Sequence, residues 1–460
     1  MTKAKIDLGK GSVGKLLVSL ALPAIIAQLV NVLYNIVDRI FIGRMVNGEV
    51  AMAGVGVAFP LIMIISAFSA LIGMGGAPLA AIKMGKKDND GAEEILSNSF
   101  STLVIIGVLC TVVFLIFNEK LLWAFGASDA TIGYAKDYLI IYLLGTVFVQ
   151  IALGMNSFIN TQGFAKIGMT TVIIGAIINI ALDPILIFVF DMGVKGAALA
   201  TILSQFVSAV WVLKFLFGKQ SILKIRKKYI IPKAKVLLPI LALGVSPFIM
   251  QATESVVLIS LNNKLSMYGG DLAVGAMTIM SSIMQIITLP LIGLSQGAQP
   301  IISYNFGANN LERVKKTFKL LLTCCLVYTI AMWGSLMLFP EVFVSIFNNK
   351  KELVEITSWS IKIFFGGIFM FGAQIACQQT FLALGQAKIS LVMALLRKIV
   401  LLVPLIFILP TFVNEGNKLA AVLAAEPVSD ILAALTTITV FIIFYKKTFN
   451  NKLEDTIKES

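Results

Sequence analysis

Hydrophobic residues dominate the chain in long runs that short polar loops separate. Typical runs cover residues 16–42, 104–117, 167–190 and 401–409. Several reach about 20 residues, enough for a helix to cross a hydrocarbon core roughly 30 Å thick. Lipid offers no hydrogen-bond partners, so an open-chain segment inside it must be helical. The pattern predicts an all-α integral membrane protein of about twelve transmembrane helices, near residues 16–42, 52–82, 95–117, 134–160, 168–190, 195–217, 236–262, 271–304, 317–340, 355–383, 389–411 and 417–445.

Composition supports this reading and sets the orientation. The 460 residues are 58% hydrophobic and only 13% charged, too little charge to cover a soluble protein of this size. Basic residues gather on alternate sides of the spans, and the richer side holds both termini. By the positive-inside rule we expect a multi-pass protein of the cell membrane with cytoplasmic termini. The richer side carries Lys3, Lys5, Lys10, Lys15, Lys83, Lys86, Lys87, Lys166, the stretch 214–235, Arg313, Lys315, Lys316, Lys319 and Lys388.

The net charge of +13 is spread over many short loops, so it indicates contact with anionic lipid and no nucleic-acid partner. The lysine-rich start has no small-residue cleavage site, and we expect a retained first helix.

The two halves of the chain resemble each other at an offset of 222 residues. Gly75, Pro78 and Gly85 align with Gly297, Pro300 and Gly307, and "GFAKI" (163–167) aligns with "GQAKI" (385–389). An even number of helices in each half gives both halves the same orientation, which is typical of transporters that work by alternating access. We predict an N-lobe (1–217), a cytoplasmic linker (218–235), a C-lobe (236–445) and a cytoplasmic tail (446–460).

Polar residues inside the first span form a stripe. Gln28, Asn31, Asn35 and Asp38 recur every three or four residues beside Tyr34, so they share one helix face. Ionisable groups in lipid are costly and usually face a cavity or ion path. The alternative is that Asp38 pairs with Arg39 or lies among headgroups, although adjacent residues on a helix do not face each other.

Later spans contain further polar pairs. Asn179 and Asp183 lie four residues apart before Pro184, whose ring frees backbone carbonyls that bind cations; the alternative is a helix-end cap. Thr201 and Ser204 are candidate hydroxyl partners in the next span, unless they hydrogen-bond to the backbone of their own helix. Gln251 and a buried Glu254 indicate a second ion or substrate site, unless Glu254 pairs with Arg397 or Lys398. Gln374 and Gln378 either line the same cavity or join helices, and Glu426 and Asp430 favour an ion-pair role.

Enzymatic chemistry is not indicated. The sequence has no His, and Cys110, Cys324, Cys325 and Cys377 lie in apolar runs without metal-ligand spacing. It contains no P-loop, no nucleophile elbow and no dinucleotide fingerprint, so we expect an ion gradient, not ATP or a cofactor, to supply the energy.

Several segments resemble the multidrug and toxic compound extrusion (MATE) family, closest to its bacterial DinF/MepA-like branch. They are "LYNIVDRIFIGRM" (33–45), "LDPILIF", "GAALAT" (196–201), "GAQPIISYNFGANN" and "AEPVSD" (425–430), and the likeness spans about residues 10–445. The resemblance implies an antiporter that exports cationic or amphipathic compounds in exchange for H⁺ or Na⁺. It implies an N-lobe cation site at Asp38, Asn179, Asp183 and Thr201, whereas the C-lobe acidic pattern is incomplete because Gln374 and Gln378 stand without an Asp.

The main alternative function is a lipid-linked oligosaccharide flippase of the same superfamily. A flippase needs a basic cavity for pyrophosphate, whereas the stripe here is neutral and acidic. An intramembrane enzyme would need a nucleophile–base or metal set that the spans lack. A two-lobe transporter works as a monomer, which is the oligomeric state we expect.

Overall fold

The computed structural model describes residues 7–348 and 350–458, with side chains up to residue 447. Lys3 and Lys5 lie outside this part. Helices account for nearly all of it. The first half contains α1 (Val13–Gly43), α2 (Gly48–Gly85), α3 (Asn89–Ala124), α4 (Ile132–Leu144), α5 (Thr146–Thr161), α6 (Ala165–Pro184), the π-helix η1 (Ile185–Val189) and α7 (Val194–Phe217).

The second half repeats this succession with more interruptions. It contains η2 (Lys227–Tyr229), α8 (Ala234–Ala252), α9 (Glu254–Gly307), α10 (Leu311–Leu338), α11 (Pro340–Ser345), α12 (Lys351–Phe364), α13 (Ile368–Ala383), α14 (Ala387–Leu395), the π-helix η3 (Leu396–Leu402), α15 (Val403–Ile408), η4 (Leu409–Phe412), η5 (Glu415–Asn417) and α16 (Lys418–Lys458).

The predicted spans are present. Within the described residues, nine helical segments are long and apolar enough to cross a membrane, or eleven when the bent pairs α4–α5 and α12–α13 each count as one span. One of them, Ala234–Gly307, is 74 residues long. It folds back at Gly270, whose φ of 62° and ψ of −161° are not helical. Counting its two arms separately gives the twelve spans expected from the sequence.

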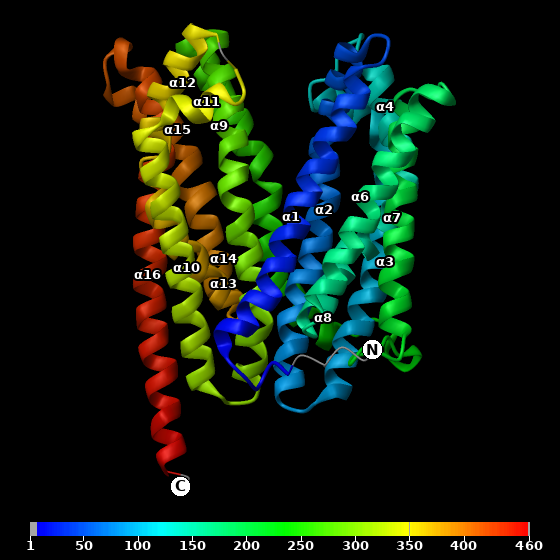
Figure 1. The fold of residues 1–460 in the computed structure, drawn as a ribbon, viewed down its shortest axis with the longest axis vertical. Helices are drawn as coiled ribbons and strands as arrows, with labels where there is room; N and C mark the ends of the chain where they lie inside the picture. Colours follow the sequence, from blue (N-terminus) through cyan, green and yellow to red (C-terminus); the bar gives the residue numbers. More distant parts are fainter. Residues whose placement is uncertain (1–6, 349, 459–460) are drawn as a thin grey trace.

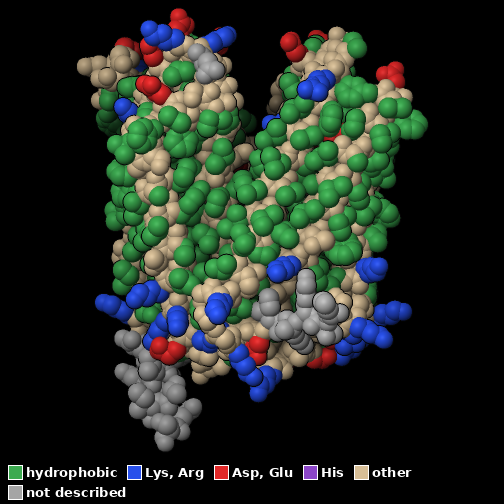
Figure 2. Space-filling model, viewed as in Figure 1, with side chains coloured by type: hydrophobic (Ala, Val, Ile, Leu, Met, Phe, Trp, Pro, Cys, Tyr) green, Lys and Arg blue, Asp and Glu red, His purple; other side chains and the backbone are tan. Residues whose placement is uncertain are grey.

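The helices form two bundles that meet at one end and separate at the other (Figure 1). One bundle contains α1 to α7, and the other contains α9, α10 and α12 to α16. Figure 2 shows a belt of hydrophobic side chains across the visible face of the molecule, with charged residues above and below and Lys and Arg concentrated at the lower end. This belt is the surface that an integral membrane protein presents to lipid. We call the lower end, where α1 and α10 begin, the basic end.

The internal repeat recurs in the backbone. Lys87 and Asn309, 222 residues apart, both adopt positive φ, of 61° and 57°. The next residues, Asp88 and Asn310, cap α3 and α10 by accepting hydrogen bonds from Gly91 N (2.9 Å) and Arg313 N (3.3 Å). A side-chain oxygen at this position satisfies a free N–H of the first turn. The two halves therefore share one local fold.

The same symmetry governs how the bundles touch at the basic end. A Cβ added to Gly85 would lie 2.0 Å from the carbonyl oxygen of Tyr304, and one added to Gly307 would lie 2.0 Å from that of Ile82. Both pairs are related by the offset of the repeat, so each half makes the same contact with the other. Only glycine lets two backbones approach this closely. The contact between α2 and α9 closes the molecule at this end.

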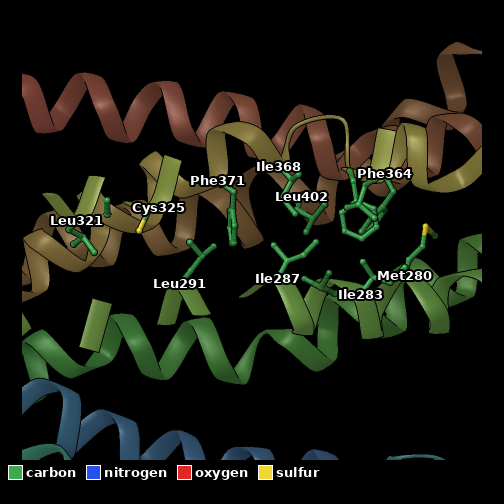
Figure 3. Packing of buried hydrophobic residues seen from close by; sticks show 14 of the residues in the cluster. Met280, Ile283, Ile287, Leu291, Leu321, Cys325, Phe364, Ile368, Phe371 and Leu402 are labelled. Carbon is green, nitrogen blue, oxygen red and sulfur yellow. The ribbon is translucent and has the colours of Figure 1, made fainter. Parts of the chain in front are cut away.

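Most of the second bundle's core lies between α9 and the helices behind it. Figure 3 shows Ile283, Ile287 and Leu291 of α9 facing Ile368 and Phe371 of α13. All five side chains are buried, and they belong to one continuous hydrophobic cluster. This packing makes the second bundle a firm unit, and Leu16, Leu17 and Leu20 of α1 extend the same cluster to the first bundle.

Ion pairs attach the segment between the bundles to the start of α3. The buried Glu93 accepts hydrogen bonds from Arg226 Nε (2.7 Å) and Lys224 N (3.1 Å), and Lys233 pairs with Glu94 at 2.7 Å. Lys228 and the Tyr229 hydroxyl beside Asp90 hold the pKa of that carboxyl below its usual value. The segment thus follows the surface of the first bundle.

Candidate functional site

A cavity of about 880 Å³ opens among the helices of the first bundle. Its walls come from α1, α2, α4, α5, α6 and α7, and Gln251 of α8 and Gln296 of α9 complete it. Ligand pockets for small molecules usually measure about 300–1,000 Å³. The cavity is therefore large enough for a small organic molecule.

The predicted stripe on α1 faces this cavity. Gln28, Asn31, Tyr34, Asn35 and Asp38 all line it. Asn35 is exposed and donates to the carbonyl of Asn31 (2.7 Å), whereas Gln28 reaches Gln296 of the second bundle at 3.5 Å. Asp38, at the other end of the stripe, is buried, with 9% of its surface exposed.

Asn179, Asp183 and Thr201 form a second polar group beside the cavity. Asn179 Nδ2 donates to Asp183 Oδ1 (3.3 Å) and to Thr201 Oγ1 (3.5 Å), which joins α6 to α7. Asn179 and Asp183 are almost completely buried, and Thr201 lines the cavity wall. Directly after Asp183 and Pro184 the helix widens into η1, and π-helical turns are frequent at functional sites.

The two polar groups belong together electrostatically. The carboxylates of Asp38 and Asp183 interact through space, and α1 packs against α6. Asp38 Oδ1, Asn179 Oδ1 and Asp183 Oδ2 are buried without a hydrogen-bond partner among the described residues. Buried acceptors without donors are costly, and two neighbouring carboxylates repel each other. Arg39 offsets part of the charge of Asp38, but it forms no ion pair with it within the described residues. A proton or a small cation would relieve both costs.

The oxygen atoms present suit a hard cation better than a transition metal. The described residues contain no group of three or more His, Cys, Asp or Glu that could hold a metal ion. Carboxylate, amide and hydroxyl oxygens are instead the ligands that hard cations prefer. The candidate cation site therefore consists of Asp38, Asn179, Asp183 and Thr201.

Glu254 differs from the sequence expectation of a buried acid inside a helix. It follows the break between α8 and α9 at Thr253, its side chain is 56% exposed, and it pairs with Lys398. Pairing with Lys398 was one of the alternatives that the sequence left open. Gln251, one turn earlier, does line the cavity.

Gln374 and Gln378 do not line the cavity, contrary to one of the two readings of the sequence. Both are buried within the second bundle. Gln378 Nε2 donates to the carbonyl of Ser390 (3.2 Å) and lies 3.4 Å from Ser246 Oγ, which ties α13 to α14 and α8. Its contacts are those of a residue that joins helices.

Glu426 and Asp430 form the ion pairs that the sequence favours. Arg397 Nε donates to Asp430 Oδ1 (2.7 Å), Arg397 Nη2 donates to Glu426 Oε1 (3.0 Å), and the guanidinium lies 4.7 Å from the centre of the Phe371 ring. All three charged side chains are buried. The second bundle thus holds paired charges where the first holds unpaired ones.

Sequence reasoning missed part of the cavity wall. Tyr138 and Tyr142, one turn apart on α4, stack with ring centres 6.3 Å apart and line the cavity. Four methionines contribute to the same surface: Met52, Met63, Met74 and Met169. The pair of tyrosines four residues apart in an apolar span was the available signal, because a Tyr hydroxyl in lipid needs a polar neighbour.

A sequence model of the MatE family matches residues 23–185 and again residues 247–408. The chain belongs to the MatE family. The two matches fall on the two halves of the repeat, which explains why one family pattern covers most of the chain. The family consists of multidrug efflux transporters, so the protein is a membrane transporter and its helical belt spans a bilayer.

Similar proteins agree with this assignment. The multidrug export protein MepA of Staphylococcus haemolyticus is 27% identical over 424 residues, 92% of this chain and 93% of that protein. A crystal structure of a MATE protein in the bent conformation superimposes with a TM-score of 0.91 at 23% identity, over 98% of this chain and 100% of that one. A MOP superfamily transporter from Pyrococcus furiosus, described as having a binding pocket of reverse polarity, gives 0.88 at 24% identity, over 96% and 98%. These structural likenesses concern the fold.

Proposed function

We propose that this MatE-family protein is an antiporter that exports cationic or amphipathic compounds in exchange for H⁺ or Na⁺. The observation that carries the proposal is the set of three partnerless buried oxygens, on Asp38, Asn179 and Asp183, beside a cavity of about 880 Å³. A site with unpaired negative charge attracts either the coupling ion or a cationic substrate. Competition between the two is what an antiporter requires.

The lining of the cavity supports an organic cation as substrate. Among the described residues, the cavity lining contains two carboxylates, on Asp38 and Glu49, and one guanidinium, on Arg39. The Arg39 guanidinium lies 5.3 Å from the centre of the Phe59 ring. Aromatic rings of Tyr34, Tyr138 and Tyr142 attract cations through their faces. Methionine side chains adapt to ligands of different shape, which suits several substrates.

The mechanism follows from alternating access of the two bundles. The bundles meet at the basic end through Gly85 and Gly307 and separate at the opposite end (Figure 1). With the basic end in the cytoplasm, this arrangement is outward-facing, and both termini are cytoplasmic. One ion that enters from outside neutralises one of the two carboxylates, Asp38 or Asp183, and a second ion neutralises the other where both are ionised. The substrate then leaves, and the monomer turns inward to release what it has bound.

The membrane potential adds to the driving force. Each net positive charge that moves inward across 100 mV yields about 2.3 kcal/mol, so the potential contributes when two ions enter for one exported monocation, or one ion for a neutral compound. The reaction needs no nucleotide and no other cofactor, and the plasma membrane is where the gradients of H⁺ and Na⁺ are available.

Flippase activity on lipid-linked oligosaccharides is the alternative. A pyrophosphate group needs several basic side chains, and Arg39 is the one guanidinium or ammonium group of the described cavity lining. The charge balance of the cavity therefore favours a cationic substrate.

Flux in liposomes tests the proposal. The purified chain is reconstituted, and uptake of a fluorescent organic cation is followed under an imposed pH gradient and then under a Na⁺ gradient. We expect one gradient to drive the dye in the wild type and not in Asp38→Asn. Asp129→Asn makes the same chemical change at an exposed loop position and should transport normally. Dye movement in Asp38→Asn equal to the wild type would overturn the site, and no movement under either gradient would favour the flippase.

A further inference from the structure

A second cavity lies outside the transport site, on the membrane-facing side of the second bundle. Its volume is about 930 Å³, and its walls come mainly from α10, α13 and α16 near the basic end. α13 packs against both α10 and α16 and forms the floor, where Ala373 and Cys377 are buried. The cavity is therefore a groove between α10 and α16, which we call the α10–α16 groove.

Each wall presents one stripe of its helix to the groove. On α16 the lining residues Ile438, Phe441, Ile442, Tyr445 and Lys446 follow the helical spacing i, i+3, i+4, i+7 and i+8. On α10 the same spacing runs from Glu312 through Lys319 to Leu322 and Leu326. Residues at this spacing share one helix face. Both stripes change in the same direction, from apolar in the membrane to basic at the basic end.

The whole groove, with its basic mouth included, has the length of one bilayer leaflet with its headgroups. Glu312 and Leu326 are separated by roughly 21 Å along α10, from a rise of about 1.5 Å per residue. One leaflet contributes about half of a hydrocarbon core roughly 30 Å thick, and the polar headgroups add to it. Phe441 stacks on Phe318 at 4.4 Å at the inner wall. In a bilayer, lipid chains fill a groove of this kind, because the side chains that line an empty groove would lose their van der Waals contacts.

The mouth of the groove is positively charged. Lys316, Lys319 and Lys446 line it, and none of them has an ion-pair partner among the described residues. The carboxylate of Glu312, also at the mouth, already pairs with Lys315 at 3.2 Å. Three ammonium groups are thus free to bind a phosphate at headgroup level.

We propose that the α10–α16 groove binds one anionic phospholipid, with an acyl chain along α13 and the phosphate on Lys316, Lys319 and Lys446. A zwitterionic lipid fits the apolar part equally well but neutralises the lysines less. The groove therefore selects by headgroup charge while the chains supply the contact area. This site is separate from the substrate cavity and does not depend on which compound is exported.

Lipid retention measured by native mass spectrometry tests the proposal. The delipidated full chain in detergent is titrated with dioleoyl phosphatidylglycerol or with dioleoyl phosphatidylcholine. We expect one phosphatidylglycerol to be retained with at least about tenfold preference, since each surface lysine contributes about fivefold toward an anionic lipid. The triple variant K316Q/K319Q/K446Q should reduce the preference to near one.

A matched control removes the same charge elsewhere at the basic end. K86Q/K214Q/K219Q changes three exposed lysines of the first bundle and should keep the preference. Ala373→Leu fills the floor and should weaken retention of both lipids. Glycerol 3-phosphate, which has the phosphate without chains, should not compete.

Three results would each overturn the proposal. They are equal retention of the two lipids by the wild type, an unchanged preference in K316Q/K319Q/K446Q, and a loss of preference in the control as large as in that variant. Competition by glycerol 3-phosphate would assign the lysines to a soluble anion. The lysine variants change exposed side chains, so the test remains valid if Ala373→Leu fails to fold.

Discussion

Asp183 has an environment that is unfavourable for stability and that we interpret as functional. Its side chain is buried, one oxygen receives a long hydrogen bond of 3.3 Å from Asn179, and the other has no partner in the described part of the chain. A charged group placed in this way destabilises the protein unless a cation joins it. Under the proposed function, the partnerless buried oxygens of the site are what would attract the coupling ion.

Asp183→Asn should therefore stabilise the protein and abolish ion-coupled transport. The amide keeps the shape and removes the buried charge, so we expect unfolding in detergent to shift upward by a few degrees, consistent with about 1–2 kcal/mol. Thermal unfolding measures the first effect and dye flux in liposomes the second. A variant that is less stable, or that still transports, would contradict this account of Asp183.

Arg397 illustrates the opposite case, a buried charge that is fully paired. Arg397→Met should destabilise the protein by about 3–5 kcal/mol, because it leaves Glu426 and Asp430 buried and uncompensated. The triple variant R397M/E426Q/D430N removes all three charges and should recover most of the folded yield. The measurement is the yield of monodisperse protein from each variant, which should be higher for the triple variant than for Arg397→Met. Equal yields would show that the three residues are not a structural ion pair.

The periodicity of polar residues predicted which side chains line the cavity, but it did not predict the exposure of individual residues or the contacts between helices. The three- and four-residue spacing on α1 identified the stripe from Gln28 to Asp38, all of which lines the cavity. Glu254 was misjudged because its exposure depends on the helix break at Thr253, six residues after the one nearby signal, Pro247. Contacts between helices, such as Gln378 with Ser390, depend on packing that spacing does not encode.

At the level of helices, the positions of the spans were predictable and their bends were not. Residues 134–160 and 355–383 were each expected as one span, and each is a pair of helices, bent by 60° and 50°. The first bend falls at Gly145, where a Cβ would lie 2.2 Å from a side-chain carbon of Ile202. A single glycine in an apolar run does not predict such a contact or the bend, since isolated glycines also occur in straight helices.

The segment that connects the bundles depends on one buried carboxylate at the start of α3. Glu93→Ala removes the acceptor of Arg226 Nε and Lys224 N, so we expect faster trypsin cleavage at Lys224, Arg226 and Lys227. Three- to tenfold faster cleavage corresponds to a loss of about 1 kcal/mol of local stability. Glu94→Ala removes only the pair with Lys233 and should change the rate little. Equal rates in both variants would contradict the role of Glu93.

For the whole molecule, the repeat explains how two similar bundles make a gate. Lys87 and Asn309 give the two halves the same turn, and Gly85 and Gly307 make the same backbone contact across the pseudo-two-fold axis. An inward-facing state requires these contacts to break. The basic end should therefore open when a side chain is placed at either glycine.

Gly307→Leu tests this gate. We expect spin labels at positions 86 and 316, in a cysteine-free background, to show a shift of most molecules toward longer distances. Gly334→Leu is the matched control, because a Cβ there meets nothing within 4 Å. An unchanged distance distribution in Gly307→Leu would show that the glycine contact does not hold the basic end closed.

We propose that substrate and coupling ion compete for the same carboxylates, those of Asp38 and Asp183. The most direct measurement is the affinity of a fluorescent organic cation for the detergent-solubilised protein, as a function of pH and of Na⁺ concentration. Thermodynamic linkage is reciprocal: if binding of the substrate displaces an ion, a higher concentration of that ion must weaken binding of the substrate. We expect the affinity of the wild type to fall by up to tenfold for each tenfold rise in H⁺ or in Na⁺, and that of Asp38→Asn to be insensitive to both. A wild-type affinity indifferent to both ions would contradict the account.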